Sequence, residues 1–203
     1  MGPERNRAAV FLGFFFLLAG WLVSAPPAGA VSFAECPPTG LNTGCRLEIN
    51  ISSTATVSIL TDAAQSATFD GSEDTLIGVR NNSSLTIPSL TLTSASLNIF
   101  GFDGDGICAQ SPQPAGCPFG PTGYEGPGVS FTGINAAQTA GNVVFAGGLT
   151  PGATAFFGLE EPLSSASFQV SGPGIVTPEP ATLLLVGSAL VGVGARARRR
   201  RHL

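Results

Sequence analysis

The stretch Leu47-Glu48-Ile49-Asn50-Ile51 alternates large apolar residues with polar ones, and it decides the fold class of this chain. Such period-two alternation is typical of a β-strand that buries one of its two faces. The pattern recurs along the chain, in runs that clusters of Gly, Asn, Asp and Pro separate. These runs are Val57 with Ile59, and the segments 75–80, 85–92, 97–102, 129–134, 142–146, 154–159 and 167–170.

Short alternating runs of this kind predict an all-β, immunoglobulin-like antiparallel β-sandwich. Outside the two ends of the chain, no stretch has helical periodicity. The segment Asn81-Asn82-Ser83-Ser84 lies between two alternating runs. It is interpreted as a hairpin connection, because Asn tolerates left-handed backbone angles.

Residues 1–30 have the three-part pattern of a secretory signal peptide. Arg5 and Arg7 precede an apolar run over residues 8–23, and Ala28-Gly29-Ala30 follows two prolines. A small-x-small site after an apolar run is typical of signal cleavage. We expect a signal helix that is recognised at Ala28 and Ala30 and removed after Ala30. The alternatives are a buried core helix and an uncleaved anchor.

The other end combines a proline-flanked acidic residue, an uncharged apolar segment and a cluster of arginines. Thr177-Pro178-Glu179-Pro180 leads into residues 181–195, and five arginines follow within residues 196–201. A helix over residues 181–195 would rise about 22 Å, less than the ~30 Å of a hydrocarbon core. The arginines favour an anchor all the same, because cations on the cytoplasmic side orient a short apolar segment. We expect a short transmembrane helix here.

The tripeptide Pro178-Glu179-Pro180, the apolar segment and the arginine cluster resemble, in this order, the PEP-CTERM sorting domain of exopolysaccharide-producing Gram-negative bacteria. The resemblance covers residue 177 to about residue 201. It implies that exosortase, a membrane-embedded cysteine peptidase, recognises the tripeptide as a sorting signal and processes the chain near it. It also implies an inner-membrane-anchored precursor, then a protein at the cell surface or outside the cell. The alternative is an ordinary tail anchor.

Residues 31–177 are the expected exported domain, between the signal peptide and the sorting and anchor segment 178–203. The whole chain has a formal net charge of −4. Residues 31–177 carry eleven acidic side chains against Arg46 and Arg80, a formal charge of −9. An acidic domain without lysine repels nucleic acid and anionic polymers. We therefore expect no nucleic-acid partner.

Several stretches of this domain resemble a recurring exported bacterial domain that often precedes the same tail. The resemblance spans about residues 70–168, supports the sandwich fold and implies no activity. The stretches that carry it are Leu76-Ile77-Gly78-Val79-Arg80-Asn81-Asn82, Phe100-Gly101-Phe102-Asp103-Gly104-Asp105-Gly106-Ile107, Thr122-Gly123-Tyr124-Glu125-Gly126-Pro127 and Phe156-Phe157-Gly158-Leu159-Glu160-Glu161-Pro162.

Four cysteines lie in the expected exported domain. An even number of cysteines in an exported chain is typical of disulfides, and four cysteines allow three pairings. We favour Cys36 with Cys45 and Cys108 with Cys117, because each bond would close a loop rich in Gly or Pro. A zinc site is the alternative, with little support: the spacing is not CxxC, and the one histidine, His202, lies in the tail.

The domain offers few groups for catalysis, because residues 31–177 contain neither His nor Lys to serve as a base. We expect a non-enzymatic protein with a structural or adhesive role in an exopolysaccharide matrix or biofilm, and exopolysaccharide is a candidate partner. The alternative from another class is a secreted hydrolase that cleaves polysaccharide with a pair of carboxylates.

Asp103-Gly104-Asp105-Gly106 is the sharpest candidate site in the sequence. Two carboxylates on Gly-flanked backbone suit Ca²⁺, so we expect Asp103 and Asp105 as candidate ligands in a Ca²⁺-dependent adhesion module, and no other cofactor. The segment is not an EF-hand, because Ile107 and Pro114 stand at required ligand positions. Glu125 and Glu160-Glu161 are candidates to complete the site. The alternative is a pair of tight turns.

Overall fold

The computed structural model describes residues 33–176, and in this range the chain is all-β, with eight strands and no helix. The predicted signal helix with its cleavage residues Ala28 and Ala30 lies outside the described residues. The sorting tripeptide Pro178-Glu179-Pro180 and the predicted transmembrane helix also lie outside them. Within residues 33–176, no helix is long and apolar enough to cross a membrane.

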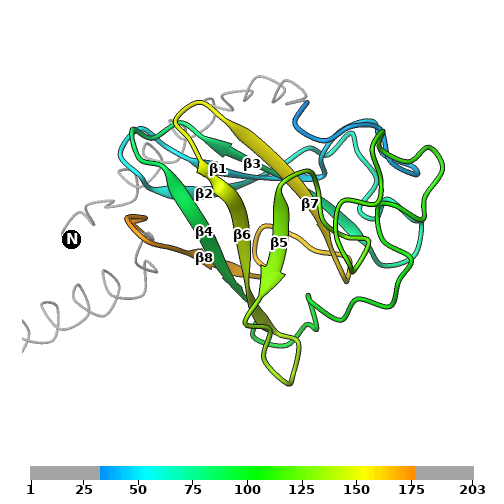
Figure 1. Ribbon diagram of the computed structural model, residues 1–203. Coiled ribbons are helices and arrows are strands. Elements are labelled where there is room, and N and C mark those ends of the chain that lie inside the picture. The colour runs from blue at the N-terminus through cyan, green and yellow to red at the C-terminus, as the bar shows by residue number, and fades with distance from the viewer. Residues whose placement is uncertain (1–32, 177–203) are drawn as a thin grey trace, which may run out of the picture.

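The eight strands form two four-stranded sheets (Figure 1). The first sheet has the order β2-β1-β3-β7, from β1 (Leu47–Ile51), β2 (Val57–Thr61), β3 (Thr75–Asn81) and β7 (Thr154–Leu159). The second has the order β5-β6-β4-β8, from β4 (Ile87–Thr93), β5 (Val129–Thr132), β6 (Ala140–Leu149) and β8 (Gln169–Ser171).

The alternating residues form one hydrophobic core that both sheets share. Leu47, Ile49 and Ile51 of β1 are fully buried in it, and so are Leu90 and Leu92 of β4 in the opposite sheet. Burial of one such side chain stabilises the folded state by roughly 1.5–3 kcal/mol. The period-two pattern thus selects which face of each strand turns inward. The all-β prediction is confirmed, and the immunoglobulin-like assignment stays a prediction.

One strand pair departs from the predicted antiparallel arrangement. β1 and β3 run parallel, with Leu47 opposite Ile77 and Ile51 opposite Asn81, whereas the other strand pairs described are antiparallel. The reason lies in the connection that follows β2. This connection, residues 62–74, stays at the end of the sheet where β1 begins and passes β1, so β3 starts beside the start of β1.

The predicted hairpin at Asn81-Asn82-Ser83-Ser84 is wrong, because β3 and β4 belong to different sheets. Asn81 lies at the end of β3, where the chain leaves the first sheet for the second. Its fully buried side chain donates hydrogen bonds to the carbonyl oxygens of Leu85 and Leu149, each at 2.8 Å. Its Oδ1 accepts hydrogen bonds from the backbone N–H (3.0 Å) and the hydroxyl (2.7 Å) of Ser83. The Asn81 side chain therefore makes the hydrogen bonds here that backbone pairing between strands makes within a sheet.

The predicted strand over residues 97–102 is also wrong. This segment is irregular, and the N–H of Gly101 closes a turn onto the carbonyl of Asn98 at 2.7 Å. Ile99 and Phe100 are neighbours and both are buried in the core. Successive side chains of a strand point to opposite faces of the sheet, so two neighbours that enter the same core do not fit a regular strand.

A layer of irregular segments covers the outer face of the first sheet. It consists of the N-terminal segment 33–46, the connection 62–74 and part of the long connection 94–128, which gather on one side of the sheets (Figure 1). The N–H of Gly40 donates to the carbonyl of Pro112, and that of Leu41 to the carbonyl of Phe69. A second core lies beneath this layer, formed by Phe33, Cys36, Cys45, Phe69, Leu76 and Ile107.

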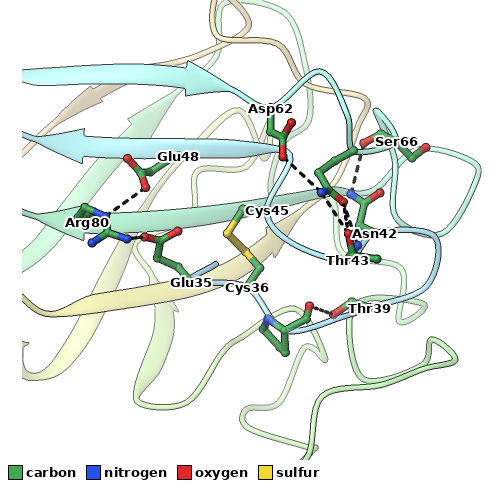
Figure 2. The surroundings of a disulfide bond; sticks show 12 residues. Glu35, Cys36, Thr39, Asn42, Thr43, Cys45, Glu48, Asp62, Ser66 and Arg80 are labelled. Carbon is green, nitrogen blue, oxygen red and sulfur yellow. Dashed lines mark hydrogen bonds and ion pairs between the residues drawn. A yellow bond between two sulfur atoms is a disulfide. The ribbon is translucent and has the colours of Figure 1, made fainter. Parts of the chain in front are cut away.

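A disulfide closes a loop within each of two segments of the covering layer. Cys36 is bonded to Cys45 and Cys108 to Cys117, the pairing that the sequence favours. The Cys36–Cys45 bond lies against the sheet, beside Arg80 and Glu48 (Figure 2). A side chain at Gly78 of β3 would collide with the sulfur of Cys45, so the close approach requires glycine at this position.

A charged group ties the N-terminal segment to the same face of the sheet. The guanidinium of Arg80 on β3 pairs with Glu35 of the N-terminal segment and, at 3.4 Å, with Glu48 on β1 (Figure 2). The carboxylates of Glu35 and Glu48 are almost fully buried, whereas the Arg80 side chain is 41% exposed. Arg80 is thus the cation that compensates two carboxylates taken out of water.

We predict that Asn81→Ala lowers the free energy of unfolding by about 2–4 kcal/mol, because buried carbonyl and hydroxyl groups lose their partners. Denaturant unfolding measures this change. The exposed neighbour Asn82 provides the matched control, and Asn82→Ala should change the free energy by less than about 0.5 kcal/mol. Equal effects of the two changes would contradict the role given to Asn81.

We predict that Arg80→Gln lowers the free energy of unfolding by about 2–4 kcal/mol, because two buried carboxylates lose their cation. Arg80→Lys keeps the charge and should lose less. Both values come from urea unfolding at neutral pH. An unchanged stability in Arg80→Gln would show that the charged group does not hold the N-terminal segment in place.

Candidate functional site

Six carboxylates gather at the end of the first sheet where β3 begins and β7 ends. We call them the acidic cluster. They belong to two groups, within each of which one carboxylate oxygen per residue lies within 4.8 Å of the others. The groups are Asp70 with Asp74 and Asp105, and Glu73 with Asp103 and Glu160.

The connection between β2 and β3 supplies three of these residues through a tight loop that Asp70 organises. Oδ1 of Asp70 accepts hydrogen bonds from the backbone N–H groups of Ser72, Glu73 and Asp74 at 3.0–3.1 Å. An Asp side chain that binds the backbone ahead of it is a common way to close a turn. The loop therefore folds Glu73 and Asp74 back toward Asp70.

Strand register brings Glu160 to Asp74. The antiparallel pairing of β3 with β7 places Thr75 opposite Leu159, so Asp74 and Glu160 are the next facing positions beyond the last pair. Directly opposite side chains on neighbouring strands have their Cβ atoms about 5 Å apart, and like charges there repel. Both residues are buried, with Asp74 at 0% and Glu160 at 6% exposure.

Asp103 and Asp105 join the cluster through Tyr124. The Tyr124 hydroxyl donates toward Oδ1 of Asp105 at 2.7 Å and Oδ1 of Asp103 at 3.2 Å. The N–H of Asp105 donates to Asp103 at 3.2 Å, and Gly104 between them has a φ of +102°, which favours glycine. The Asp-Gly-Asp-Gly segment is thus a tight turn with both carboxylates beside one phenol.

Close packing fixes the position of the Tyr124 ring. The ring is fully buried, and its centroid lies 4.6 Å from that of Phe102. A side chain at Gly106 would collide with it. The carbonyl of Tyr124 accepts the N–H of Gly158 in β7 at 2.7 Å, so the ring is held against the edge of the first sheet.

The cluster contains buried oxygens that the protein does not satisfy. Among the described residues, neither carboxylate oxygen of Asp74 has a hydrogen-bond partner, and Oε2 of Glu160 has none either. Buried polar groups are normally paired, and an unpaired one costs roughly 1–3 kcal/mol, more when it is charged. The side chains of the acidic cluster therefore do not satisfy all of its buried oxygens.

Burial and repulsion from neighbouring carboxylates raise the pKa of the two buried members of the cluster, Asp74 and Glu160. Burial, with repulsion from Glu160, raises the pKa of Asp74 to about 9. Burial also raises the pKa of Glu160 to about 7. The side-chain hydrogen bond between Asp103 and Asp105 raises the pKa of Asp105 and lowers that of Asp103. Burial and the bond to Asp105 raise the pKa of Tyr124, which stays protonated as a donor.

The described residues offer the cluster no positive side chain. Residues 33–176 contain two cationic side chains, Arg46 and Arg80. Arg80 pairs with Glu35 and Glu48, and Arg46 donates to the carbonyl oxygens of Asp62 and Gln65 at 2.7 and 2.9 Å. An arrangement of six carboxylate groups with hard oxygen atoms suits a divalent cation, and it lacks the thiol and imidazole ligands that zinc prefers.

The structure brings together part of the site that the sequence indicates. Asp103, Asp105 and Glu160 all belong to the cluster. Glu125 does not: its carboxylate accepts hydrogen bonds from Thr122 and Gly123 and closes their turn. Glu161 also lies outside both groups, and its backbone carbonyl accepts the hydroxyl of Thr75 at 2.8 Å.

Sequence reasoning missed Asp70, Glu73 and Asp74. A signal for them exists, because Asp70-Gly71-Ser72-Glu73-Asp74 is a second acidic, Gly-containing turn directly before a buried strand. The two turns are more than twenty residues apart, and nothing in the sequence indicates that they lie close together in the fold. The parallel placement of β3 and the return of residues 94–128 across the sheet bring them together.

Comparison with known proteins bears on the other end of the chain. Residues 176–200 match the family model described as the PEP-CTERM protein-sorting motif. No curated protein and no solved structure matches the chain. The motif supports an exported protein with a membrane-anchored precursor and exosortase as its processing partner. The chain therefore carries the PEP-CTERM protein-sorting motif directly after its β-domain.

Proposed function

We propose that this protein is a non-enzymatic component of the cell surface or extracellular matrix, with a structural or adhesive role in an exopolysaccharide biofilm. The observation that carries the proposal is the sorting motif at residues 176–200, directly after a compact β-domain with two disulfides. Disulfides persist in oxidising compartments outside the cytoplasm, so they agree with export. Exosortase processing then leaves the β-domain as the mature protein.

The burial of the acidic residues supports a role without catalysis. A glycosidase needs two carboxyl groups that flank the scissile bond of a bound sugar. Asp74 and Glu160 have the raised pKa values of such acids, but they are buried at 0% and 6% exposure beneath the covering segments. Residues 31–177 also lack His and Lys, so no other ordinary general base is at hand.

The charge of the domain narrows the class of polysaccharide partner. With a formal charge of −9 over residues 31–177, the domain repels acidic polymers at low ionic strength. A neutral polysaccharide, or an acidic one bridged by divalent cations, fits such a surface.

Changing Pro178 and Pro180 together to Ala should leave the chain uncut, because it alters the proposed sorting signal. The intact mass of the protein recovered from its native host measures this. The unchanged protein should begin at Val31, end near Thr177 and become four hydrogens heavier on reduction of its two disulfides. Pro173→Ala, an exposed change before the motif, is the matched control and should be cut normally.

Recovery of the unchanged protein with its arginine tail attached would contradict this part of the proposal. If Pro173→Ala also kept its arginine tail, the failure to remove the tail would not depend on the tripeptide. The mass under non-reducing conditions reports the disulfides independently of the tail.

The purified exported protein should show no turnover of the host's matrix polysaccharides, because its buried carboxyls do not reach a substrate. Release of reducing ends over time measures this. If turnover occurs and the double change of Asp74→Asn and Glu160→Gln abolishes it in a folded protein, the protein is the carboxylate-dependent hydrolase instead.

A further inference from the structure

We propose that the acidic cluster is a Ca²⁺ site, in which the triad of the buried Asp74 and the half-buried Asp70 and Asp105 holds the ion. The site clamps two distant segments of the chain, residues 70–74 and 103–105, at one end of the first sheet. This inference goes beyond the proposed function and does not depend on how the tail is processed.

The unpartnered carboxylate of Asp74 is the observation that carries the inference. Its side chain is fully buried, and neither of its oxygens has a hydrogen-bond partner among the described residues. One of these oxygens lies within 4.8 Å of carboxylate oxygens from both Asp70 and Asp105. The carboxylates of Glu35 and Glu48, by contrast, each pair with the guanidinium of Arg80.

The spacing of the triad agrees with a shared ion. Oxygens bound to one Ca²⁺ at about 2.3–2.6 Å lie at most about 5 Å from one another. The triad oxygens are within 4.8 Å, so small side-chain rotations suffice to place them around one centre. The hydrogen bond that Tyr124 donates to Asp105 at 2.7 Å orients that carboxylate, as donors behind metal ligands commonly do.

The charge around the triad favours a divalent cation. Glu73, Asp103 and Glu160 form the second group of the cluster, and Glu160 lies close enough to raise the pKa of Asp74 by repulsion. Both arginines of the described range are engaged elsewhere. Water screens this repulsion poorly in a covered site, whereas a bound ion with two positive charges offsets it.

The origin of the ligands favours Ca²⁺ over Mg²⁺. The triad draws on two loops, residues 70–74 and 103–105, and neither is part of a regular element. Ca²⁺ accepts six to eight oxygens in a flexible geometry, whereas Mg²⁺ demands a nearly ideal octahedron at shorter distances and gives up water reluctantly. Carboxylates from loops, with unequal burial, therefore suit Ca²⁺ better than Mg²⁺.

A bound ion would lock the covering layer onto the sheet. Asp70 and Asp74 belong to the connection that enters β3, and Asp105 belongs to the long connection before β5. Glu160, in the second group of the cluster, directly follows β7. Hydrogen bonds from the hydroxyl of the buried Tyr124 hold Asp103 and Asp105 at this place. Removal of the ion should therefore loosen the loops and lower the thermal stability of the domain.

The competing explanation is that the two buried carboxyls of the cluster, Asp74 and Glu160, keep their protons. A buried carboxylic acid needs no cation if it stays protonated at neutral pH. The two explanations predict different responses to calcium, because a bound ion stabilises the folded state by RT ln(1 + c/Kd), where c is the free Ca²⁺ concentration, whereas a site that keeps its protons does not respond.

The test uses the protein as recovered from its host, stripped with EDTA and dialysed. Calorimetric titration with CaCl₂ should show binding, and the Tm should rise by about 5–10 °C at a hundredfold excess of Ca²⁺ over Kd. MgCl₂ at the same concentration should raise the Tm much less. Stabilisation by Mg²⁺ as large as that by Ca²⁺ would overturn the assignment of the ion.

The variant Asp74→Asn separates loss of the site from loss of the fold. The amide has the shape of the protonated acid, so the stripped variant should melt no lower than the stripped unchanged protein. Its Ca²⁺ affinity should fall by about tenfold or more, because affinity depends on the charge of the ligands. Glu161→Gln removes a neighbouring carboxylate outside the cluster and should bind Ca²⁺ as the unchanged protein does.

Tb³⁺ locates the ion relative to Tyr124, the one tyrosine of the chain. Tb³⁺ takes oxygen ligands as Ca²⁺ does, and it emits when a nearby aromatic ring transfers energy to it. We expect tyrosine-sensitised emission that Ca²⁺ displaces and that Asp74→Asn loses. Absence of Ca²⁺ binding in the unchanged protein, or unchanged binding in Asp74→Asn, would overturn the proposal in favour of a protonated cluster.

Discussion

The structure depends on β3 being buried on both of its faces. Ile77 and Val79 face the core between the sheets, while Leu76 and Gly78 face outward and are buried as well. A strand in this position needs a cover on its outer side, and no further sheet supplies one among the described residues. Irregular segments do so instead, and because loops have few internal backbone hydrogen bonds, disulfides and side-chain groups must hold them.

The covering layer is held at two places that differ in their chemistry. Near the middle of the sheet, Arg80 compensates Glu35 and Glu48 beside the Cys36–Cys45 disulfide. At the end of the sheet, six carboxylates meet around Tyr124 with no arginine among them. In the first arrangement each carboxylate pairs with the guanidinium of Arg80. The second leaves the carboxylate of Asp74 without a partner, which is why a cation from outside is the natural complement there.

The positions of the errors in the sequence-based interpretation follow one physical rule. Period-two patterns identified the strands whose one face is apolar, such as β1 and β4. They failed at residues 97–102, where two adjacent apolar residues enter the core from a turn. They failed again at Asn81, where a buried side chain redirects the chain between sheets. In both places, tertiary contacts outweigh the local pattern.

The sequence by itself determined the class of the fold, the cysteine pairs that it favoured and the sorting motif, because each is written in local spacing that the chain keeps in any conformation. It also marked Asp103 and Asp105, whose Gly-flanked turn is local too. Only the tertiary structure decided that Asp70, Asp74 and Glu160 meet them. Their proximity depends on the β3–β7 register and the parallel placement of β3 beside β1, which are long-range choices without a local signature.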